Sequence, residues 1–327
     1  MKLNANPINL WLLLDDRAGN RSQCLGVADA LAIPGLKKEL AYSPWAKLPN
    51  RLLGASFAGL SGACKRDITG PWPDLVLAAG RRTAPVARKI KQLSKGHAKL
   101  VQIMWPQDHS VDDFDLICVP NHDAVPDLPN VFRMTGAPSS VNTTNSPPAG
   151  PELTTHIDAL PSPRIALLCG GSTKNRQFSD AMAIGLGRSA SAMANGCGGA
   201  LLITTSRRSG AAATTLVQHV DAPAHLHQWD DAGENPYRAY LSRADAFIVT
   251  GESISMCSEA CSTGKPVYIY APDGLITEKH NRFHQELYKM GYARPLSGVY
   301  EPWTYSPLNA ARQIADEIRR RIPLAIG

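Results

Sequence analysis

Residues 164–174 read RIALLCGGSTK, a short apolar run that ends in two glycines and two hydroxyl residues. Such a run, bounded by turn-forming residues, is typical of a strand buried on both faces, as in parallel sheets. The same pattern recurs on either side of this stretch. Strands are expected at residues 8–14, 75–79, 100–105, 116–120, 164–169, 200–205, 246–250 and 267–270.

Helical patterns alternate with these strands, which predicts parallel α/β architecture. Helices are expected at residues 21–31, 82–93, 177–193, 211–220, 237–242, 255–263, 280–290 and 308–321. Residues 137–163 are rich in Pro, Ser, Thr, Asn and Gly and predict a linker or long loop. We therefore predict two Rossmann-like, doubly wound domains that face a cleft, at 1–150 and 151–327. Whether the last helix packs back on the first domain is left open.

Composition excludes several classes of protein. The chain has 327 residues, 44% of them hydrophobic and 19% charged, which is far from the composition of disordered chains. Its net charge of +6 suits an anionic small molecule or surface, but no basic run with interleaved aromatics predicts nucleic-acid binding. The seven cysteines lack zinc-ligand spacing, which indicates a reducing compartment.

Targeting signals are weak in this sequence. The apolar stretch 8–14 is followed at once by Asp15 and Asp16 and is too short for a signal peptide. The longest uncharged stretch, 189–206, is too polar to span a membrane. We predict a cytoplasmic protein. Residues 45–65 mix apolar and basic side chains, so a helix there would suit the inner face of a membrane or a lipid-linked acceptor; an ordinary half-buried helix is the alternative.

Three loops of the second half carry polar residues directly after an expected strand, where ligands bind in open α/β sheets. Glycines allow close backbone approach, and hydroxyls at a helix start suit phosphate. Adjacent arginines suit a diphosphate or a carboxylate ligand, and a glutamate two turns further on suits ribose hydroxyls. A plain turn, surface arginines and helix caps are the alternatives. The candidates are Gly170, Gly171, Ser172 and Thr173; Thr205, Arg207 and Arg208; and Thr250, Glu252, Ser253, Ser255, Met256 and Glu259.

The first half carries Asp, Arg or His after four expected strands, and solvated loops are the alternative at each. These residues are Asp16, Arg17, Gly19 and Asn20; Gly80, Arg81 and Arg82; Asp108 and His109; and His122 and Asp123. No Gly-x-Gly-x-x-Gly follows the first strand, so no nicotinamide cofactor is expected. His280 and His284 lack the glutamate of a metalloprotease helix, and an exposed helix face is favoured over a metal site.

Several of these motifs, taken together, resemble the Elm-type mitochondrial fission family across residues 11–293. They are Asp16-Arg17-x-Gly19-Asn20-x-x-Gln23, Gly80-Arg81-Arg82, Pro120-x-His122-Asp123, Gly170-Gly171, Thr205-x-Arg207-Arg208 and Thr250-Gly251-Glu252-Ser253-x-Ser255-Met256-x-Ser258-Glu259-Ala260. The last motif is the most specific. The resemblance implies an adaptor that recruits a dynamin-like GTPase, as the plant members do, or a bacterial relative of undetermined activity.

The second half is also similar to the donor domain of GT-B glycosyltransferases, in particular the MurG-like transferase of peptidoglycan synthesis. This resemblance implies a UDP-sugar-like donor, with phosphates near residues 170–173 and 253–255 and ribose at Glu259. The chain departs from that transferase in its Arg207-Arg208 pair. Its loop after the first strand does not match the transferase's Gly-rich loop and histidine.

Two functional hypotheses follow, and the sequence leaves open whether the protein is an enzyme. The first is metal-independent glycosyl transfer in the interdomain cleft, with Asp16 or His109 as the base. Arg207 and Arg208 would stabilise the leaving diphosphate, and the first-half motifs, Gln23 included, would lie on the acceptor side. The second is a non-catalytic adaptor that keeps the fold and recruits a dynamin-like GTPase or another partner.

Overall fold

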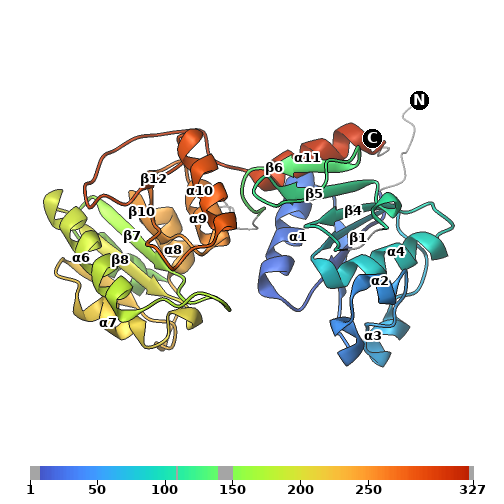
Figure 1. The fold of residues 1–327 in the computed structure, drawn as a ribbon, viewed down its shortest axis with the longest axis horizontal. Helices are drawn as coiled ribbons and strands as arrows, with labels where there is room; N and C mark the ends of the chain where they lie inside the picture. Colours follow the sequence, from blue (N-terminus) through green and yellow to red (C-terminus); the bar gives the residue numbers. More distant parts are fainter. Residues whose placement is uncertain (1–7, 108–109, 139–149, 324–327) are drawn as a thin grey trace. The chain divides into compact units, whose positions relative to one another are not determined.

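The computed structural model describes residues 8–107, 110–138 and 150–323. The chain divides into two compact units, each built around a six-stranded parallel sheet. The first unit comprises Met1–Ser140 together with Asn309–Gly327, and the second comprises Val141–Leu308. The last helix, α11 (Ala310–Arg321), therefore belongs to the first unit although it follows the whole second unit in sequence (Figure 1).

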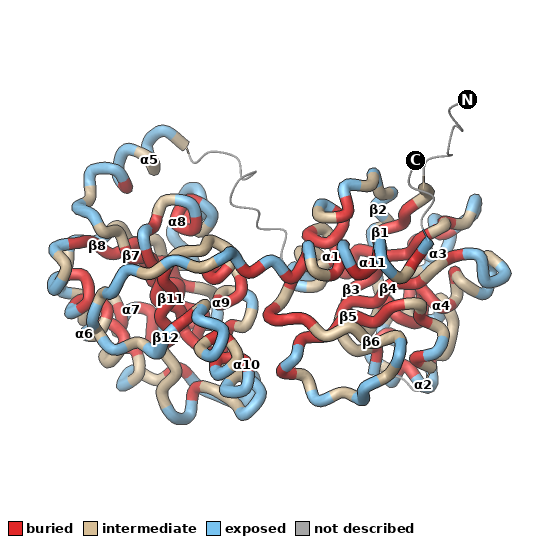
Figure 2. The backbone as a smooth tube through the Cα atoms, turned by 90° about the horizontal axis from the view of Figure 1, so that it is seen from above, coloured by how far each residue is buried: buried red, intermediate tan, exposed pale blue. Residues whose placement is uncertain are grey.

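The interior strands of the first unit's sheet are buried (Figure 2), and core residues lie on both faces. Along β1, Leu10, Leu12 and Leu14 join the core under helices α1 and α11, whereas Trp11 and Leu13 join the core under α3 and α4. The strand order is β2 (Gly35–Glu39), β1 (Leu10–Leu14), β3 (Leu75–Ala79), β4 (Lys99–Ile103), β5 (Leu116–Pro120) and β6 (Val131–Met134). The helices are α1 (Ala18–Leu31), α2 (Asn50–Leu53), α3 (Gly62–Asp67), α4 (Ala84–Leu93) and α11.

The sheet of the second unit is also covered on both faces. One core contains residues of α6 and α7, and the other contains residues of α5, α8, α9 and α10. The strand order is β12 (Arg294–Pro295), β11 (Val267–Tyr270), β10 (Ala246–Thr250), β7 (Arg164–Cys169), β8 (Ala200–Thr205) and β9 (Ala224–His227). The helices are α5 (Pro151–Asp158), α6 (Asp180–Gly196), α7 (Ala212–Gln218), α8 (Tyr237–Arg243), α9 (Ile254–Cys261) and α10 (Glu278–Lys289).

The predicted α/β class with two doubly wound parallel sheets is confirmed. The strands expected from the sequence are the interior strands of the two sheets, and the edge strands β2, β6, β9 and β12 were not predicted. An edge strand has fewer packed neighbours and needs no continuous apolar run. The sequence of β2, GLKKE, is polar and mostly exposed for this reason. Strand β4 ends at Ile103 rather than 105, because Met104 leaves the extended conformation at φ +70.

Two expectations for connecting segments are wrong. Residues 45–65 do not form one helix but a 3-10 turn (Pro44–Lys47) and the separate helices α2 and α3. Gly54 ends α2 at φ +56, which no helix can continue. The segment 137–163 is not all loop, because α5 forms where Ile157 is fully buried against the second core. Residues 139–149 lie outside the described part of the chain.

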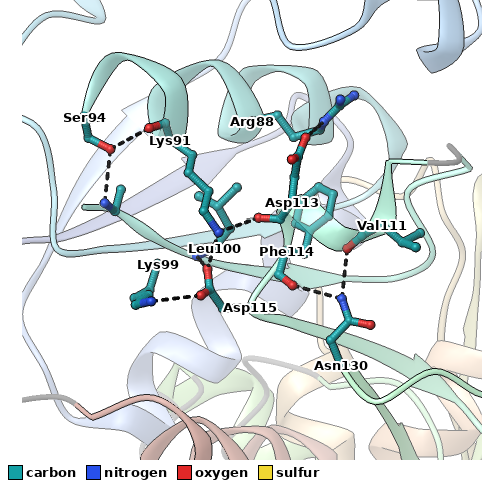
Figure 3. Close-up of polar contacts among 11 residues, drawn as sticks. Arg88, Lys91, Ser94, Lys99, Leu100, Val111, Asp113, Phe114, Asp115 and Asn130 are labelled. Atoms are coloured by element: carbon teal, nitrogen blue, oxygen red, sulfur yellow. Dashed lines mark hydrogen bonds and ion pairs between the residues drawn. The ribbon is translucent and has the colours of Figure 1, made fainter. Parts of the chain in front are cut away.

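A polar network ties α4 to the amino-terminal ends of β4 and β5 (Figure 3). Asp115 accepts hydrogen bonds from Lys91 Nζ at 2.8 Å, from the Leu100 amide at 2.9 Å and from Lys99 Nζ at 3.2 Å. Burial acts to raise the pKa of this carboxyl, but its hydrogen bonds and the lysine charges hold it below the usual value. The network therefore fixes the helix register on β4 and β5 through an ionised aspartate.

The predicted location rests on the state of the cysteines and on the absence of an apolar segment long enough to span a membrane. All seven cysteines are free thiols, and all but Cys197 are buried. Among the described residues, we find no helix with both the length and the apolar character needed to cross a bilayer.

Candidate functional site

The carboxyl edge of the second sheet brings together the loops that follow β7, β8 and β10. The Gly170 amide, after β7, donates to Thr250 Oγ1 at the end of β10, at 2.8 Å. The Ser172 amide donates to the Arg208 carbonyl at 2.9 Å. Residues from three separate parts of the predicted set thus lie in direct contact.

The two glycines are required by this close approach. Gly171 has φ +110, and a Cβ on it would lie 2.4 Å from the carbonyl carbon and oxygen of Arg208. A Cβ on Gly170 would lie 2.0 Å from Glu252 Oε1. The pair therefore lets the β7 loop pack on the neighbouring loops as bare backbone.

The β7 loop does not open directly into a helix, contrary to the sequence-based expectation. Helix α6 begins at Asp180 and is capped by the Ser179 side chain. The Ser172 hydroxyl accepts the Phe178 amide at 3.0 Å, and the Thr173 amide donates to the Arg176 carbonyl at 2.8 Å. Residues 170–173 are therefore not a helix N-terminus, since the intervening residues turn the loop back on itself.

The β8 loop holds its two arginines in different environments. A 3-10 turn, Arg207–Ser209, is closed by Ser206 and Ser209, each of which accepts a backbone amide through its hydroxyl. Arg207 is exposed and has no polar partner within the described residues, whereas Arg208 turns toward Glu252. Thr205 is buried, and its hydroxyl accepts the Trp229 amide at 3.0 Å. One arginine is thus available to an anion and the other is paired.

The β10 loop buries a carboxylate at the centre of the edge. The Glu252 side chain is 0% exposed, and its Oε1 lies 3.4 Å from Arg208 Nη2. Its Oε2 has no hydrogen-bond partner in the part of the chain that the structure describes. Burial raises the pKa of Glu252, and the charge of Arg208 opposes that rise. A buried carboxyl with a raised pKa at a strand end makes Glu252 a candidate functional residue.

Helix α9 carries the remaining predicted residues of this edge. Ser253 is buried at its start, Ser255 is exposed, and Met256 is half-buried. Tyr237, at the start of α8, donates a hydrogen bond to Glu259 Oε2. Burial, and then the Glu259 charge, raise the pKa of Tyr237 well above its usual value. Sequence reasoning missed this tyrosine, because nothing in its local pattern shows that it contacts α9.

A cavity of about 350 Å³ lies beyond the end of β11, beside α10. Its lining includes the side chains of Tyr270, Asn281, His284, Gln285 and Tyr288. His284 is buried, not on the exposed face that the sequence suggested, and its Nε2 donates to the Gly251 carbonyl at 2.8 Å. Burial lowers the pKa of His284 to about 4, so the ring is neutral at physiological pH. Within the described residues, no cluster of side chains suited to a metal ion is found.

The carboxyl edge of the first sheet carries a second polar cluster. Arg82 pairs with both Asp15 and Asp16 and stacks over the Tyr42 ring, with its Cζ 4.1 Å from the centroid. Asp15 is 1% exposed. The hydrogen bond from Arg82 lowers the pKa of Asp16. This pairing weakens Asp16 as a base, since a carboxylate of lower pKa accepts a proton less readily.

The other first-unit candidates differ in how closely they join this cluster. Asn20 Nδ2 donates to Asp15 at 3.1 Å, and a Cβ on Gly80 would lie 2.2 Å from that nitrogen. Gly19, in contrast, has open space where a Cβ would lie. Arg17 is exposed, and Gln23 is half-buried in α1. Asn20 and Gly80 thus belong to the cluster by contact.

Arg81 stabilises a neighbouring segment of the chain. The remaining first-unit candidates, His122, Asp123, Asp108 and His109, follow later in the sequence. The Arg81 guanidinium donates to the carbonyls of Ala46 and Leu48, both at 2.7 Å, and so holds the segment that precedes α2. His122 is buried, with Nε2 3.9 Å from Asp123 Oδ1. The predicted base His109 lies outside the described residues, as does Asp108.

The fold and these motifs can be compared with known proteins. A family model described as mitochondrial fission ELM1 matches residues 18–322. The chain belongs to the mitochondrial fission ELM1 family. An uncharacterised protein of Rickettsia prowazekii is 29% identical over 350 residues, covering 95% of this chain and 98% of that protein. The Arabidopsis thaliana mitochondrial fission protein ELM1 is 27% identical over 296 residues, covering 83% of this chain and 69% of that protein.

Solved structures place this ELM1-family chain in the GT-B-like fold. MurG of Acinetobacter baumannii matches with a TM-score of 0.50 at 15% identity, covering 96% of this chain and 100% of that one. UDP-GlcNAc 2-epimerase of Methanocaldococcus jannaschii matches with a TM-score of 0.53 at 9% identity, again covering 96% and 100%. The resemblance to the Elm-type family and the MurG-like fold are both confirmed, and at these identities the structures establish the fold alone.

Proposed function

We propose that this ELM1-family protein binds a nucleoside-diphosphate sugar at the carboxyl edge of its second sheet. The observation that carries the proposal is the contact between Gly170, Arg208 and Glu252, which places bare backbone, a guanidinium and a buried carboxyl at one strand edge. Arg207, exposed and next to Arg208 in the sequence, is a second cation of the same loop. Guanidinium groups bind diphosphate oxygens bidentately, and a carboxyl accepts from sugar or ribose hydroxyls.

The reaction we propose is glycosyl transfer without a metal. An acceptor hydroxyl oxygen bonds to the anomeric carbon, the bond from that carbon to the diphosphate oxygen breaks, and the diphosphate leaves with the electron pair. The hydroxyl proton passes to a base, for which Asp16 and His109 remain the predicted residues. Arg207 and Arg208 would offset the charge that develops on the leaving diphosphate, and Ser253, Ser255 and Glu259 keep their predicted phosphate and ribose roles.

Binding of UDP-N-acetylglucosamine, measured by calorimetry, tests this proposal. A charge-assisted contact contributes about 1.5–3 kcal/mol, so Arg207→Gln should weaken binding by roughly 10-fold to 150-fold. Arg188→Gln, a change of the same chemistry at an exposed position on α6, should leave binding unchanged. Absence of binding by UDP- and GDP-sugars at millimolar concentration would contradict the proposal.

A non-catalytic adaptor is the second candidate function. It is favoured by the pairing of Asp16 with Arg82, which leaves the described candidate base with a lowered pKa. The Arabidopsis relative is named as a mitochondrial fission protein. In this case the protein would recruit a dynamin-like GTPase or another partner. The test is a strain in which Gly170, Arg207 and Glu259 are all changed to alanine. A phenotype like that of the wild-type strain would support the adaptor over the transferase.

A membrane-facing role is compatible with either candidate. Trp45 and Leu52 are 64% and 66% exposed, and Lys47 and Arg51 are exposed beside them in sequence. Exposed apolar and basic side chains together suit an anionic lipid surface or a lipid-linked acceptor. We propose that this segment of the first unit contacts anionic lipid at the cytoplasmic face of a membrane.

Sedimentation with phosphatidylserine vesicles tests the membrane contact. Wild-type protein should pellet in a salt-sensitive manner, and Trp45→Ser with Leu52→Ser should reduce the bound fraction several-fold, because each removes exposed apolar area that would enter the bilayer. The control changes Leu36 and Trp229 to serine, which are likewise exposed but lie elsewhere in the sequence. Equal loss in both double variants would show general stickiness rather than a lipid contact.

A further inference from the structure

Arg208 and Glu252 form an ion pair whose two members are buried very differently. The Arg208 side chain is 38% exposed, and the Glu252 side chain is 0% exposed. Their closest atoms are 3.4 Å apart, longer than a usual charge-assisted hydrogen bond of about 2.7–2.9 Å. Arg208 Nη1 also donates to the Ser172 carbonyl, at a similarly long 3.3 Å. Arg208 is therefore held loosely and can turn toward a ligand.

Arg208 is the main group that favours the charged form of Glu252. Burial raises the pKa of this carboxyl, the charge of Arg208 is the largest opposing effect, and the Thr250 hydroxyl and the backbone amides of Gly171 and Glu252 oppose it less. Oxygen Oε2 has no partner among the described residues, so its hydrogen-bonding capacity is unused. A carboxylate that loses its cation at a buried position becomes neutral by taking up a proton rather than remaining charged.

We propose that a nucleoside-diphosphate sugar draws Arg208 away from Glu252 and onto the diphosphate, and that Glu252 takes up one proton from solvent in the same step. This inference rests on the proposed function, because it assigns a proton to the same site. In the bound state the neutral carboxyl no longer repels the diphosphate, and its O–H becomes a hydrogen-bond donor at the ligand. Affinity should then fall as the pH rises, since binding consumes a proton.

Other titratable groups face this pair from neighbouring elements. Burial raises the pKa of the Cys169 thiol, on β7, to about 12, and raises that of Cys257, on α9, well above its usual value, so both thiols stay neutral. His280, at the start of α10, has a pKa lowered by burial and by the charges of Lys279 and Arg208. An approaching anion would favour its protonation too. His280 is thus the rival proton acceptor, and the experiment must separate it from Glu252.

Calorimetry of UDP-N-acetylglucosamine binding in buffers of different ionisation enthalpy measures the protons exchanged. This ligand lacks the terminal phosphate ionisation near pH 6 that free UDP would add. For the wild-type protein we expect an uptake on the order of one proton per ligand, with affinity falling by up to about tenfold per pH unit. Glu252→Gln should abolish the uptake and flatten the pH dependence, while His280→Gln should keep both.

The possible results separate this inference from the proposed function. Binding without proton uptake at any pH from mildly acidic to mildly alkaline would overturn the inference and leave the proposed function intact. Uptake that survives in Glu252→Gln and disappears in His280→Gln would also overturn it. Absence of binding by the wild-type protein would remove the proposed function and the inference with it.

Discussion

Replacing Arg82 by methionine is expected to lower the free energy of unfolding of the first unit by about 3–5 kcal/mol at neutral pH. The guanidinium is the shared partner of Asp15 and Asp16, and Asp15 is 1% exposed. Without the cation, two adjacent carboxylates repel each other, and the buried Asp15 keeps only neutral donors, the Arg17 amide and the Asn20 side chain. Denaturant unfolding followed by fluorescence and circular dichroism measures the loss.

The neighbouring arginine supplies the control for this change. Arg17→Met replaces an exposed side chain two residues from Asp15 and should cost well under 1 kcal/mol. The deficit of Arg82→Met should shrink on acidification, because protonated carboxyls no longer need the cation. Adding Asp15→Asn to Arg82→Met should recover part of the lost stability. Equal stability of the two arginine variants would show that the Arg82 cluster is not a buried ion pair.

Replacing Gly171 by alanine is the second change with a large expected effect. Its backbone is at φ +110, where an L side chain is strained, and the added Cβ would lie 2.4 Å from backbone atoms of Arg208. Backbone atoms cannot rotate away as a side-chain end can, so the β7 and β8 loops must separate. Strain and overpacking together should cost about 2–5 kcal/mol. Binding of UDP-N-acetylglucosamine should be lost as well, since the Arg208 loop would move.

A second glycine of the same unit gives the matched control. Gly196 ends α6, has open space around its Cα, and is exposed. Gly196→Ala should leave stability unchanged or raise it by up to about 1 kcal/mol, because alanine favours the helix. Thermal unfolding and ligand binding of both variants are compared. If Gly171→Ala were as stable as Gly196→Ala and bound ligand normally, the close packing of the two loops would be refuted.

The sequence predicted the strands that are buried on both faces and failed at the sheet edges. RIALLC, the strand β7, lies inside the sheet and must be apolar on both sides, so composition alone reveals it. GLKKE, the edge strand β2, pairs with β1 on one side and exposes Leu36, Lys37 and Glu39. Its pattern is that of many surface loops. Pairing with β1, rather than local preference, makes it a strand.

The candidate site shows the same division between local pattern and tertiary contact. Gly170, Arg208 and Glu252 could be proposed from sequence, because each follows a strand and parallel strands end at one edge. Their partners could not, since Tyr42 and Tyr237 lie in segments whose local pattern marks no site. Tyr237 contacts Glu259 across 22 positions of sequence, and Tyr42 contacts Arg82 through its ring face.

By itself the sequence determined the α/β class, the interior strands and the polar residues at their ends, because burial on two faces and turns at strand ends leave local marks. Only the tertiary structure decided which of these charged groups are paired: Arg82 with Asp15 and Asp16, and Arg208 with Glu252. It also decided that the last helix packs in the first unit. Charge pairing and burial depend on neighbours that are distant in sequence. The RIALLCGGSTK stretch predicts a strand and a turn. That its two glycines pack against Arg208 and Glu252 depends on two other loops, which are distant in sequence.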